Sequence, residues 1–387
     1  MERDDQAVET LAVHADRRGA RPEGSVVYPI YQGTVYESEP GESYSDIRYL
    51  RLSTTPSQRD LHAKLAALEG AEAALAASSG MAAVSAALLS VLKAGDHLLA
   101  GDVLYGGTHS LLAKYADRLG WSYTLVDAGE PESWSGAVRP NTKAFLIESV
   151  TNPLVRVGDM RGVAEFARRH GLVSIIDNTF ATPVNFRPLS VGYDLVLHSA
   201  TKYLGGHSDL VAGCVAGSAE RVDQVRYVQN HFGGSLDPHA GFLLTRGLKT
   251  LAVRVGAQNR NGLALAEFLA GHPGVEEVNY PGLPSHPDHD RAAELFSGFG
   301  GMLSFRASGG LAAVERFLKA LTIPYVAPSL GGVETLVTRP AATSHAGMTP
   351  SARAEMGVTD DLVRVSCGIE AAADLIADFD QALAAAA

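Results

Sequence analysis

The stretches LVSIID at residues 172–177 and DLVLHS at residues 194–199 decide the fold prediction for this chain. Each is a short apolar run that ends on a polar side chain, as is typical of a buried strand. A third such run, AFLIES at residues 144–149, comes earlier, and a helical pattern from Met160 to Arg169 separates it from LVSIID. Strand, helix and strand in this order predict an α/β fold, in which helices cover both faces of a mainly parallel sheet.

The rest of the chain indicates further parts, and its 387 residues favour two to three domains. The beginning is irregular and rich in Gly, Pro, Ser and Tyr, until Leu61, Leu65 and Leu68 start a helical pattern. In the last third, a long helical stretch precedes strand, helix, strand, strand and helix, which predicts a smaller α+β domain. We therefore expect an N-terminal arm at residues 1–57, a large domain at residues 58–240 and a C-terminal α+β domain at residues 241–387.

Composition and charge exclude several classes of function. The 32 Lys and Arg residues against 43 Asp and Glu residues give a net charge of −11, which disfavours binding to nucleic acid or an anionic membrane surface. Cys214 and Cys367 are too few for a disulfide framework and favour a reducing compartment. The acidic start MERDDQAVET differs from a signal peptide, and no apolar run reaches membrane-spanning length. We expect a cytoplasmic protein without nucleic-acid or membrane partners.

Polar residues directly follow the predicted strands, where ligands of parallel sheets bind. Asp177 ends the second strand, the run SATK ending at Lys202 follows the third, and ESVTN at residues 148–152 follows the first. A lysine that leaves a buried strand is desolvated, which prepares its amine for Schiff-base chemistry. In isolation such a lysine is more typical of a surface loop. Ser199 and Thr201 beside it offer hydroxyl groups to an anion.

A second candidate site is SSGM at residues 78–81, which opens an apolar helix with small residues. The free N–H groups of a helix start can bind a phosphate, although SSG alone is more often a plain helix cap. Together, the chain offers a phosphate site, an amine that can form an imine and a carboxylate for a protonated ring nitrogen. Pyridoxal 5′-phosphate requires these groups.

In these residues and in the segments around them, the sequence resembles the Cys/Met-metabolism, or transsulfuration, enzymes, which bind pyridoxal 5′-phosphate. The resemblance implies their type I, aspartate aminotransferase-like fold, a large domain that binds the cofactor and an arm that contributes to a neighbouring active site. It is carried by ESVTNP (148–153), IIDNTFATP (175–183), HSATKYLGGHSDLVAG (198–213), FGGSLDPH (232–239), YPGLPSHP (280–287), GFGGMLSF (298–305), APSLGGVETL (327–336) and LVRVSCGIE (362–370).

The resemblance implies three catalytic residues. Lys202 would bond to the cofactor and then move protons, Asp177 would pair with the ring nitrogen, and Tyr105 would stack on the ring and act at the leaving group. Tyr49 and Arg51 on the arm would reach the phosphate of a neighbouring subunit, which implies a homo-oligomer, expected to be a tetramer built from active dimers. For the substrate, a small amino acid, the implied residues are Arg364, Ser329 and Asn152. For the cofactor they are Lys202, Gly80, Met81, Tyr105, Asn152, Asp177, Thr179, Ser199, Thr201, Tyr49 and Arg51.

The resemblance leaves the reaction open between γ-elimination and γ-replacement, but the sequence departs from the family pattern. Ser110 stands where members that handle cystathionine often carry an arginine, and Pro328 stands where many carry a glutamate. A pocket without these charges has less reason to select a second charged end on the substrate. We expect a carbon–sulfur lyase acting by γ-elimination on a sulfur amino acid, of methionine γ-lyase or cystathionine γ-lyase type. The alternative is a cystathionine γ-synthase that joins cysteine to an activated homoserine.

Other readings are weaker. A dehydrogenase would need GxGxxG after its first strand, and none occurs in that context. A scaffold without cofactor would not need Lys202 or Asp177. His286 and His289 in SHPDHD have the spacing of a metal pair but lack further ligands, so we expect a solvated loop and no metal site.

Overall fold

The computed structural model describes residues 6–15, 22–41, 43, 47–347 and 349–386. Its larger sheet has seven strands, and the predicted strands lie next to one another at its centre. β2, β3, β4, β5 and β6 pair in parallel, whereas β7 runs antiparallel to both β6 and β1. In sheet order the strands are β1 (Ala73–Ala77), β7 (Gly213–Gly217), β6 (Leu195–His198), β5 (Val173–Asp177), β4 (Thr142–Glu148), β2 (His97–Gly101) and β3 (Ser122–Val126).

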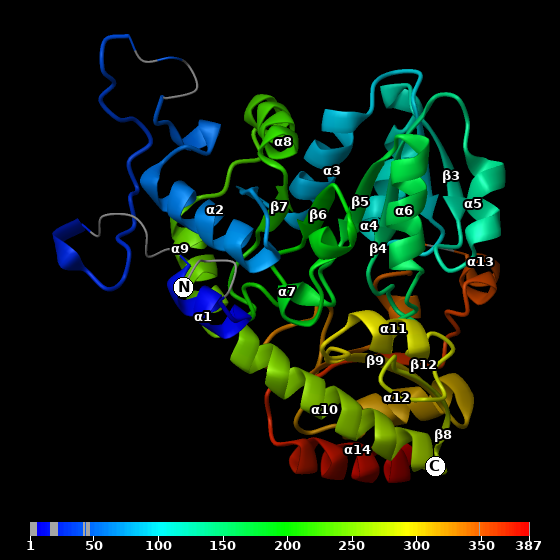
Figure 1. The fold of residues 1–387 in the computed structure, drawn as a ribbon. Coiled ribbons are helices and arrows are strands. Elements are labelled where there is room, and N and C mark those ends of the chain that lie inside the picture. Colours follow the sequence, from blue (N-terminus) through cyan, green and yellow to red (C-terminus); the bar gives the residue numbers. More distant parts are fainter. Residues whose placement is uncertain (1–5, 16–21, 42, 44–46, 348, 387) are drawn as a thin grey trace.

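Helices bury both faces of this sheet (Figure 1). Successive strand residues alternate between two apolar clusters, so that Ile175 packs on one face and Ile176 on the other. This alternation confirms the α/β prediction of a sheet covered by helices on both sides. One face packs against α2 (Pro56–Glu69), α6 (Met160–His170) and α9 (Pro238–Leu248), and the other against α3 (Gly80–Val91), α4 (Gly106–Tyr115) and α8 (Ala219–Phe232).

Local sequence signals set the ends of these helices. Thr55 and Gln58 form a capping box at the start of α2, where Pro56 occupies the first helical position. The Asp159 side chain caps α6 by accepting a 2.9 Å hydrogen bond from the Gly162 N–H. The remaining short helices are α5 (Pro131–Ala137), α7 (Thr182–Asn185), α11 (His289–Leu295) and α13 (Pro350–Glu355), with 3₁₀ turns at Pro22–Gly24, Leu50–Leu52, Asp117–Leu119, Pro188–Val191 and Pro340–Ala342.

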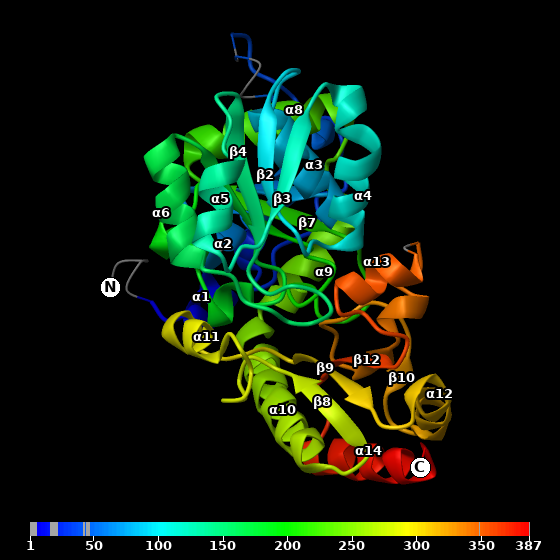
Figure 2. The same cartoon turned by 90° about the vertical axis from the view of Figure 1, so that its right-hand side faces the viewer.

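A second, five-stranded sheet follows in the C-terminal part of the chain (Figure 2). It is mainly antiparallel, with one parallel pair between β10 and β11. In sheet order its strands are β10 (Tyr325–Val326), β11 (Leu336–Thr338), β12 (Leu362–Ser366), β9 (Met302–Ala307) and β8 (Val275–Asn279). Its apolar core includes residues from three helices, α10 (Leu251–Gly271), α12 (Gly310–Ala320) and α14 (Ala372–Ala386).

The long helix α10 joins the two sheets. Leu251 and Val255 at its start belong to the core of the large sheet, whereas Leu265 and Leu269 near its end belong to the core of the small one. Figure 1 shows it running beneath the large sheet toward α14. We propose that the chain divides into the arm, the large domain and the C-terminal domain expected from the sequence, with α9 and α10 as the connection.

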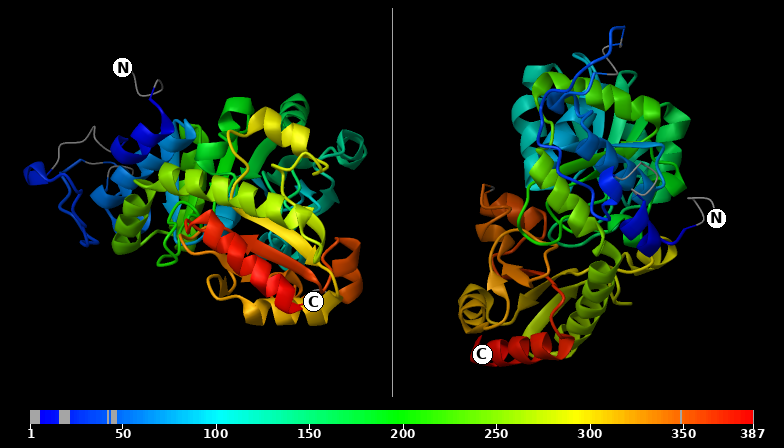
Figure 3. Two further views of the ribbon diagram at one scale, coloured as in Figure 1. Left: turned by 90° about the horizontal axis from the view of Figure 1, so that it is seen from below. Right: turned by 90° about the vertical axis from the view of Figure 1, so that its left-hand side faces the viewer.

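The N-terminal part differs from the irregular segment that its composition predicts. It contains the helix α1 (Val8–His14), which packs on α2 and α10 and buries Leu11. The Lys64 side chain of α2 donates a 3.1 Å hydrogen bond to the Ala12 carbonyl. Residues 22–41 then project from the side of the molecule (Figure 3). In the described part of the chain, no helix combines the length and apolar character needed to cross a membrane.

Candidate active site

One cavity of about 650 Å³ lies where the carboxyl ends of β4, β5 and β6 face the starts of α3 and α4. The C-terminal part of the chain closes it with residues from β12 and from the loops around Pro328 and Thr343. Eleven of the thirteen residues expected at the site are among its lining. The lining comprises Ser79, Gly80, Met81, Val84, Tyr105, Glu148, Val150, Asn152, Asp177, Thr179, Phe180, Ser199, Thr201, Lys202, Val211, Pro328, Ser329, Leu330, Thr343, Ser344 and Arg364.

Lys202 reaches the cavity from the loop that follows β6. Its Nζ donates a 2.6 Å hydrogen bond to the Ser329 Oγ. Burial, together with the positive charge of Arg364, lowers the pKa of Lys202 from 10.5 to about 8. A substantial fraction of this amine is therefore neutral near physiological pH, the form in which it can attack a carbonyl carbon.

Asp177 is the last residue of β5, and Thr179 orients its carboxylate. Oδ1 of Asp177 accepts hydrogen bonds of 2.5 Å from the Thr179 hydroxyl and 3.0 Å from the Thr179 N–H. The same hydroxyl accepts a 2.8 Å bond from the N–H of Ser199, so it links the ends of β5 and β6. Burial raises the pKa of Asp177, and the bonds from Thr179 oppose that rise.

Glu148 is a second carboxylate in the cavity, and the sequence did not single out its role. It ends β4 directly beside Asp177 in the sheet register, and its side chain accepts a hydrogen bond from the N–H of Tyr105. Burial and the neighbouring Asp177 raise the pKa of Glu148 well above its usual range. Two carboxyl groups this close in a buried site disfavour double ionisation. Thr179 stabilises the Asp177 carboxylate, so we infer that Glu148 holds the proton.

The start of α3 is a candidate site for an anion. Ser79 caps the helix by accepting a 3.0 Å bond from Ala82 N–H, and Gly80 opens the first turn. A Cβ at Gly80 would lie 2.8 Å from the Ser199 Cβ, so only glycine lets the helix start approach the loop after β6. Met81 and Thr201 line the same region, and the Thr201 hydroxyl donates a 3.1 Å bond to the Ala212 carbonyl.

Arg364 of β12 lies opposite, 5% exposed. Its guanidinium donates bonds of 3.1 Å to Asn152 Oδ1 and 2.7 Å to the Ser329 carbonyl. Its Nε is buried, and none of the described residues accepts a hydrogen bond from it. Within the described part of the chain no carboxylate forms an ion pair with Arg364, so its charge and this N–H are available to a ligand carboxylate.

Comparison with known proteins identifies the family. The family model described as Cys/Met metabolism PLP-dependent enzyme matches residues 9–384. The chain belongs to this family. Its cofactor is therefore pyridoxal 5′-phosphate, and the protein is a PLP-dependent enzyme of the transsulfuration type.

The relatives of this chain are named for different activities. The chain is 43% identical to a cystathionine gamma-lyase of Bacillus subtilis, over 97% of this chain and 98% of the relative. It is 41% identical to a cystathionine gamma-synthase of Mycobacterium leprae (97% and 96%) and 40% identical to a cystathionine beta-lyase of Lactococcus lactis (97% and 99%). A solved structure of cystathionine gamma-lyase from Lactobacillus plantarum, complexed with L-serine, superimposes with a TM-score of 0.93 at 36% identity, covering 98% and 99% of the two chains.

The residues of the cavity fit the cofactor of this transsulfuration family. The glycine at the start of α3 and the hydroxyl of Ser199 suit a phosphate, Lys202 suits an aldehyde, and Asp177 suits a protonated ring nitrogen. The unpartnered Nε of Arg364 suits the carboxylate of an amino acid.

Tyr49 and Arg51 are the two expected site residues that do not line the cavity of their own chain. Arg51 instead donates a 2.8 Å hydrogen bond to the Asn230 carbonyl of α8, and its guanidinium lies 5.6 Å from the Tyr49 ring centroid. Their expected place at a neighbouring subunit's site stays a prediction.

The histidine pair in SHPDHD does not form a solvated loop. His286 is 4% exposed, and its Nδ1 accepts a 3.1 Å bond from the Asp288 N–H. His289 bonds through Nδ1 to the Pro281 carbonyl at 2.8 Å and stacks on Phe299. Among the described residues, no group of three or more His, Cys, Asp or Glu side chains is arranged to hold a metal ion.

Proposed function

We propose that this enzyme is a carbon–sulfur lyase that acts by γ-elimination on a sulfur amino acid, of methionine γ-lyase or cystathionine γ-lyase type. One observation carries the proposal. Among the described residues that line the cavity, the ionisable side chains are Lys202, Arg364, Asp177, Glu148 and the phenol of Tyr105. In this proposal each of them acts on the cofactor, on the α-carboxylate or on the departing sulfur, or lies beside a group that does. A second charged end on the substrate therefore finds no counter-charge in the described lining. This favours an uncharged γ-substituent and so, of the two types, methionine γ-lyase over cystathionine γ-lyase.

The substrate would be held by its α-carboxylate. The guanidinium of Arg364 offers its buried Nε and shares its other N–H groups with Asn152 and Ser329. Because these neighbours fix the plane of the guanidinium, the carboxylate would bind in one orientation. Ser329 bonds to Arg364 through its carbonyl and to Lys202 through its hydroxyl, so a carboxylate held by Arg364 would place the α-carbon of the substrate near the Lys202 amine.

The cofactor, once bound, supplies an electron sink for negative charge that develops next to the amino group. Lys202 would move protons at the α-carbon and β-carbon, because its pKa of about 8 lets it both accept and release a proton near neutral pH. Asp177 would keep the ring nitrogen protonated. Tyr105, which is 48% exposed, would act as the acid at the departing sulfur.

A second candidate function is γ-replacement. It is supported by the 41% identity to a protein named cystathionine gamma-synthase, over nearly the whole chain. In that reaction the thiol of cysteine would bond to the γ-carbon after the γ-substituent has left. In γ-elimination, hydrolysis to a 2-oxo acid and ammonia follows instead.

The assembly and location are also proposals. We propose a homotetramer built from active dimers, in which Tyr49 and Arg51 of the arm reach the cofactor phosphate of the neighbouring subunit. The exposed Val26 and Val35 of the arm, 84% and 73% accessible in the single chain, support a contact with a second copy. We propose a cytoplasmic location.

The experiment is a substrate panel with product analysis. Methionine, homocysteine, cystathionine and O-acylhomoserine are each incubated with the enzyme, with and without cysteine. Without added cysteine, we expect 2-oxobutanoate and ammonia from methionine or homocysteine, together with methanethiol from methionine and hydrogen sulfide from homocysteine. Pyruvate and homocysteine from cystathionine would indicate β-elimination, and turnover of O-acylhomoserine only with cysteine would indicate the synthase; either result replaces the proposed function.

A further inference from the structure

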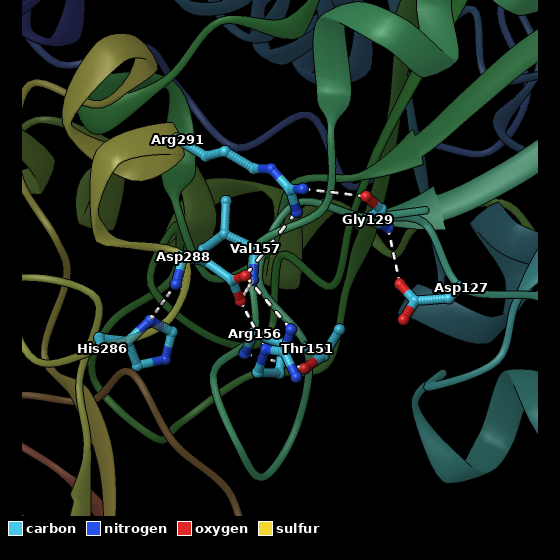
Figure 4. Close-up of polar contacts among 8 residues, drawn as sticks. All are labelled: Asp127, Gly129, Thr151, Arg156, Val157, His286, Asp288 and Arg291. Carbon is cyan, nitrogen blue, oxygen red and sulfur yellow. Dashed lines mark hydrogen bonds and ion pairs between the residues drawn. The ribbon is translucent and has the colours of Figure 1, made fainter. Parts of the chain in front are cut away.

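The turn that contains the histidine pair contacts the loop that follows β4. Asp288, which is 4% exposed, accepts hydrogen bonds of 2.6 Å and 3.2 Å from the Arg156 guanidinium and of 3.0 Å from the Val157 N–H. Figure 4 shows the Asp288 carboxylate facing both residues. Burial alone would raise the pKa of Asp288, but the bonds from Arg156 and Val157 lower it below its usual value. The carboxylate is therefore ionised near neutral pH.

A second arginine extends this contact to a neighbouring loop. Arg291 lies 3.7 Å from the Asp288 carboxylate and donates a 2.9 Å hydrogen bond to the Gly129 carbonyl (Figure 4). The N–H of Gly129 in turn donates a 2.7 Å bond to the Asp127 side chain. The Asp288 turn thus connects to the loops after β3 and after β4.

The loop after β4 contains a strained backbone position that contacts with other segments must stabilise. Two hydrogen bonds close this loop. The Thr151 N–H donates to the Arg156 carbonyl at 3.0 Å, and the Arg156 N–H donates to the Thr151 hydroxyl at 3.1 Å. Between them, buried Val155 has φ +49°, a left-handed conformation that β-branched residues rarely adopt. Such strain persists where the surroundings over-determine the backbone. Arg156 and Val157, the two residues directly after the strained position, are the ones that Asp288 holds.

The same loop carries Asn152, whose Oδ1 accepts the 3.1 Å bond from Arg364. We propose that Asp288 is a positioning residue for the carboxylate site: by holding Arg156 and Val157, it fixes the loop on which Asn152 orients Arg364. This inference rests on the proposed function of Arg364. His286 holds the backbone of Asp288, because the His286 Nδ1 accepts a hydrogen bond from the Asp288 N–H.

The chain offers a matched control. Arg161 of α6 and Glu294 of α11, the helices that directly follow the loop after β4 and the Asp288 turn, form a 3.0 Å ion pair with side chains 52% and 64% exposed. This pair does not touch the loop that carries Asn152. If the buried Asp288–Arg156 pair only stabilised the fold, its loss would lower the melting temperature without a selective effect on carboxylate binding.

The test compares Asp288→Ala, Asp288→Asn and Glu294→Ala as holoenzymes. It measures hydrogen–deuterium exchange of the peptide around residues 149–158, the Kd of L-alanine as a probe that has an α-carboxylate but no γ-substituent, KM, kcat and cofactor content. For Asp288→Ala we expect faster exchange in that peptide, an increase of about tenfold in Kd and KM, a change in kcat below about threefold and full cofactor content. Asp288→Asn, which still accepts the Val157 N–H, should lie between Asp288→Ala and the wild type. Glu294→Ala should match the wild type in exchange, Kd, KM, kcat and cofactor content.

Two results would overturn the role of Asp288. One is a wild-type Kd for L-alanine and wild-type exchange in Asp288→Ala, or in Asp288→Asn if the alanine variant does not fold. The other is a loss of kcat and cofactor at unchanged Kd. A wild-type enzyme that does not bind L-alanine at all would overturn the proposed carboxylate site together with this inference, and so is distinguishable from a failure at Asp288 alone.

Discussion

The Nζ of Lys202 donates a 2.6 Å hydrogen bond to the hydroxyl of Ser329, 127 residues later in the chain. Ser329 has φ +85°, a left-handed conformation, and its carbonyl accepts a 2.7 Å bond from Arg364. Nearby, Gly331 has φ +77°, and a Cβ there would lie 2.7 Å from the Tyr203 N atom. One strained turn from the C-terminal part of the chain therefore connects the amine of the site to its guanidinium.

Replacing Lys202 by alanine tests the amine. We expect Lys202→Ala to lose about 100- to 10,000-fold in kcat, the range that a positioned acid or base contributes. Lys143→Ala, which removes an exposed lysine of β4, serves as the control. After borohydride treatment and denaturation, the wild type and the control should keep the cofactor bound and Lys202→Ala should release it. Covalent retention in Lys202→Ala would show that another group forms the bond.

The lowered pKa of Lys202 predicts how the apoenzyme takes up its cofactor. Burial and Arg364 lower this pKa from 10.5 to about 8. The neutral amine is the nucleophile, so the fraction that can react rises with pH through about 8. The rate constant for covalent uptake of pyridoxal phosphate, followed by absorbance, should increase with a midpoint near that pH. A midpoint near the ordinary lysine value would contradict the effect of burial.

Conversion of the two neighbouring carboxyl groups into amides should affect kcat to very different extents. If Glu148 holds the proton and Asp177 is ionised, Glu148→Gln should stay within about threefold of wild-type kcat, whereas Asp177→Asn should lose about 100-fold or more. Steady-state kinetics on both variants decide this, with Asp223→Asn on the surface of α8 as control. Equal losses in both variants would refute the assignment of the proton.

Stability of the apoenzyme should also depend on Glu148. Its pKa is raised in the folded state by burial and by Asp177, so the native protein binds this proton more tightly than the unfolded chain. The resulting stability is complete below the ordinary glutamate pKa and is lost as the pH rises through the folded value. Thermal unfolding of Glu148→Gln should therefore show a weaker decline with rising pH than the wild type. An unchanged slope would mean that Glu148 is ionised.

Arg364 is predicted to bind the substrate carboxylate through a fork that lysine cannot reproduce. Arg364→Lys should raise KM about 10- to 100-fold, since hydrogen bonds to charged groups contribute about 1.5–3 kcal/mol. Cofactor content should not change. Arg306→Lys, on the neighbouring strand β9 and paired with Glu276 at 3.0 Å, is the matched control. A KM equal to that of the control would exclude Arg364 from carboxylate binding.

The candidate anion site at α3 can be tested by adding one methyl group. In Gly80→Ala the new Cβ would lie 2.8 Å from the Ser199 Cβ, so the helix start and the loop after β6 must separate. We expect about a tenfold weaker affinity for pyridoxal phosphate and a smaller change for pyridoxal, which lacks the phosphate. Equal weakening for both ligands would argue against a phosphate at this position.

The sequence predicted the central strands and most of the cavity because both depend on local patterns. β4, β5 and β6 consist mainly of apolar residues, and the polar residues that end them, such as Asp177, meet at one sheet edge by the geometry of parallel pairing. The antiparallel place of β7 was not predictable, since the pairing of Gly213–Gly217 is decided by distant strands.

Residues buried by distant segments were the ones that the sequence described poorly. The polar turn at residues 285–290 reads as solvated, yet Asp288 is 4% exposed because the loop after β4 covers it. Glu148 gained its contact with the Tyr105 N–H from a helix start 43 residues away. The helix α1 is short and buries few side chains, so its period was too weak to recognise.

One partition measurement separates γ-elimination from γ-replacement in this enzyme. The enzyme is given O-acylhomoserine, which both reactions accept in principle, with a saturating concentration of cysteine, and the ratio of 2-oxobutanoate to cystathionine is determined. We predict that 2-oxobutanoate is the main product, because the described cavity lining offers no free counter-charge for the charged groups of a bound cysteine. Cystathionine as the main product would contradict it and would identify the enzyme as a γ-synthase.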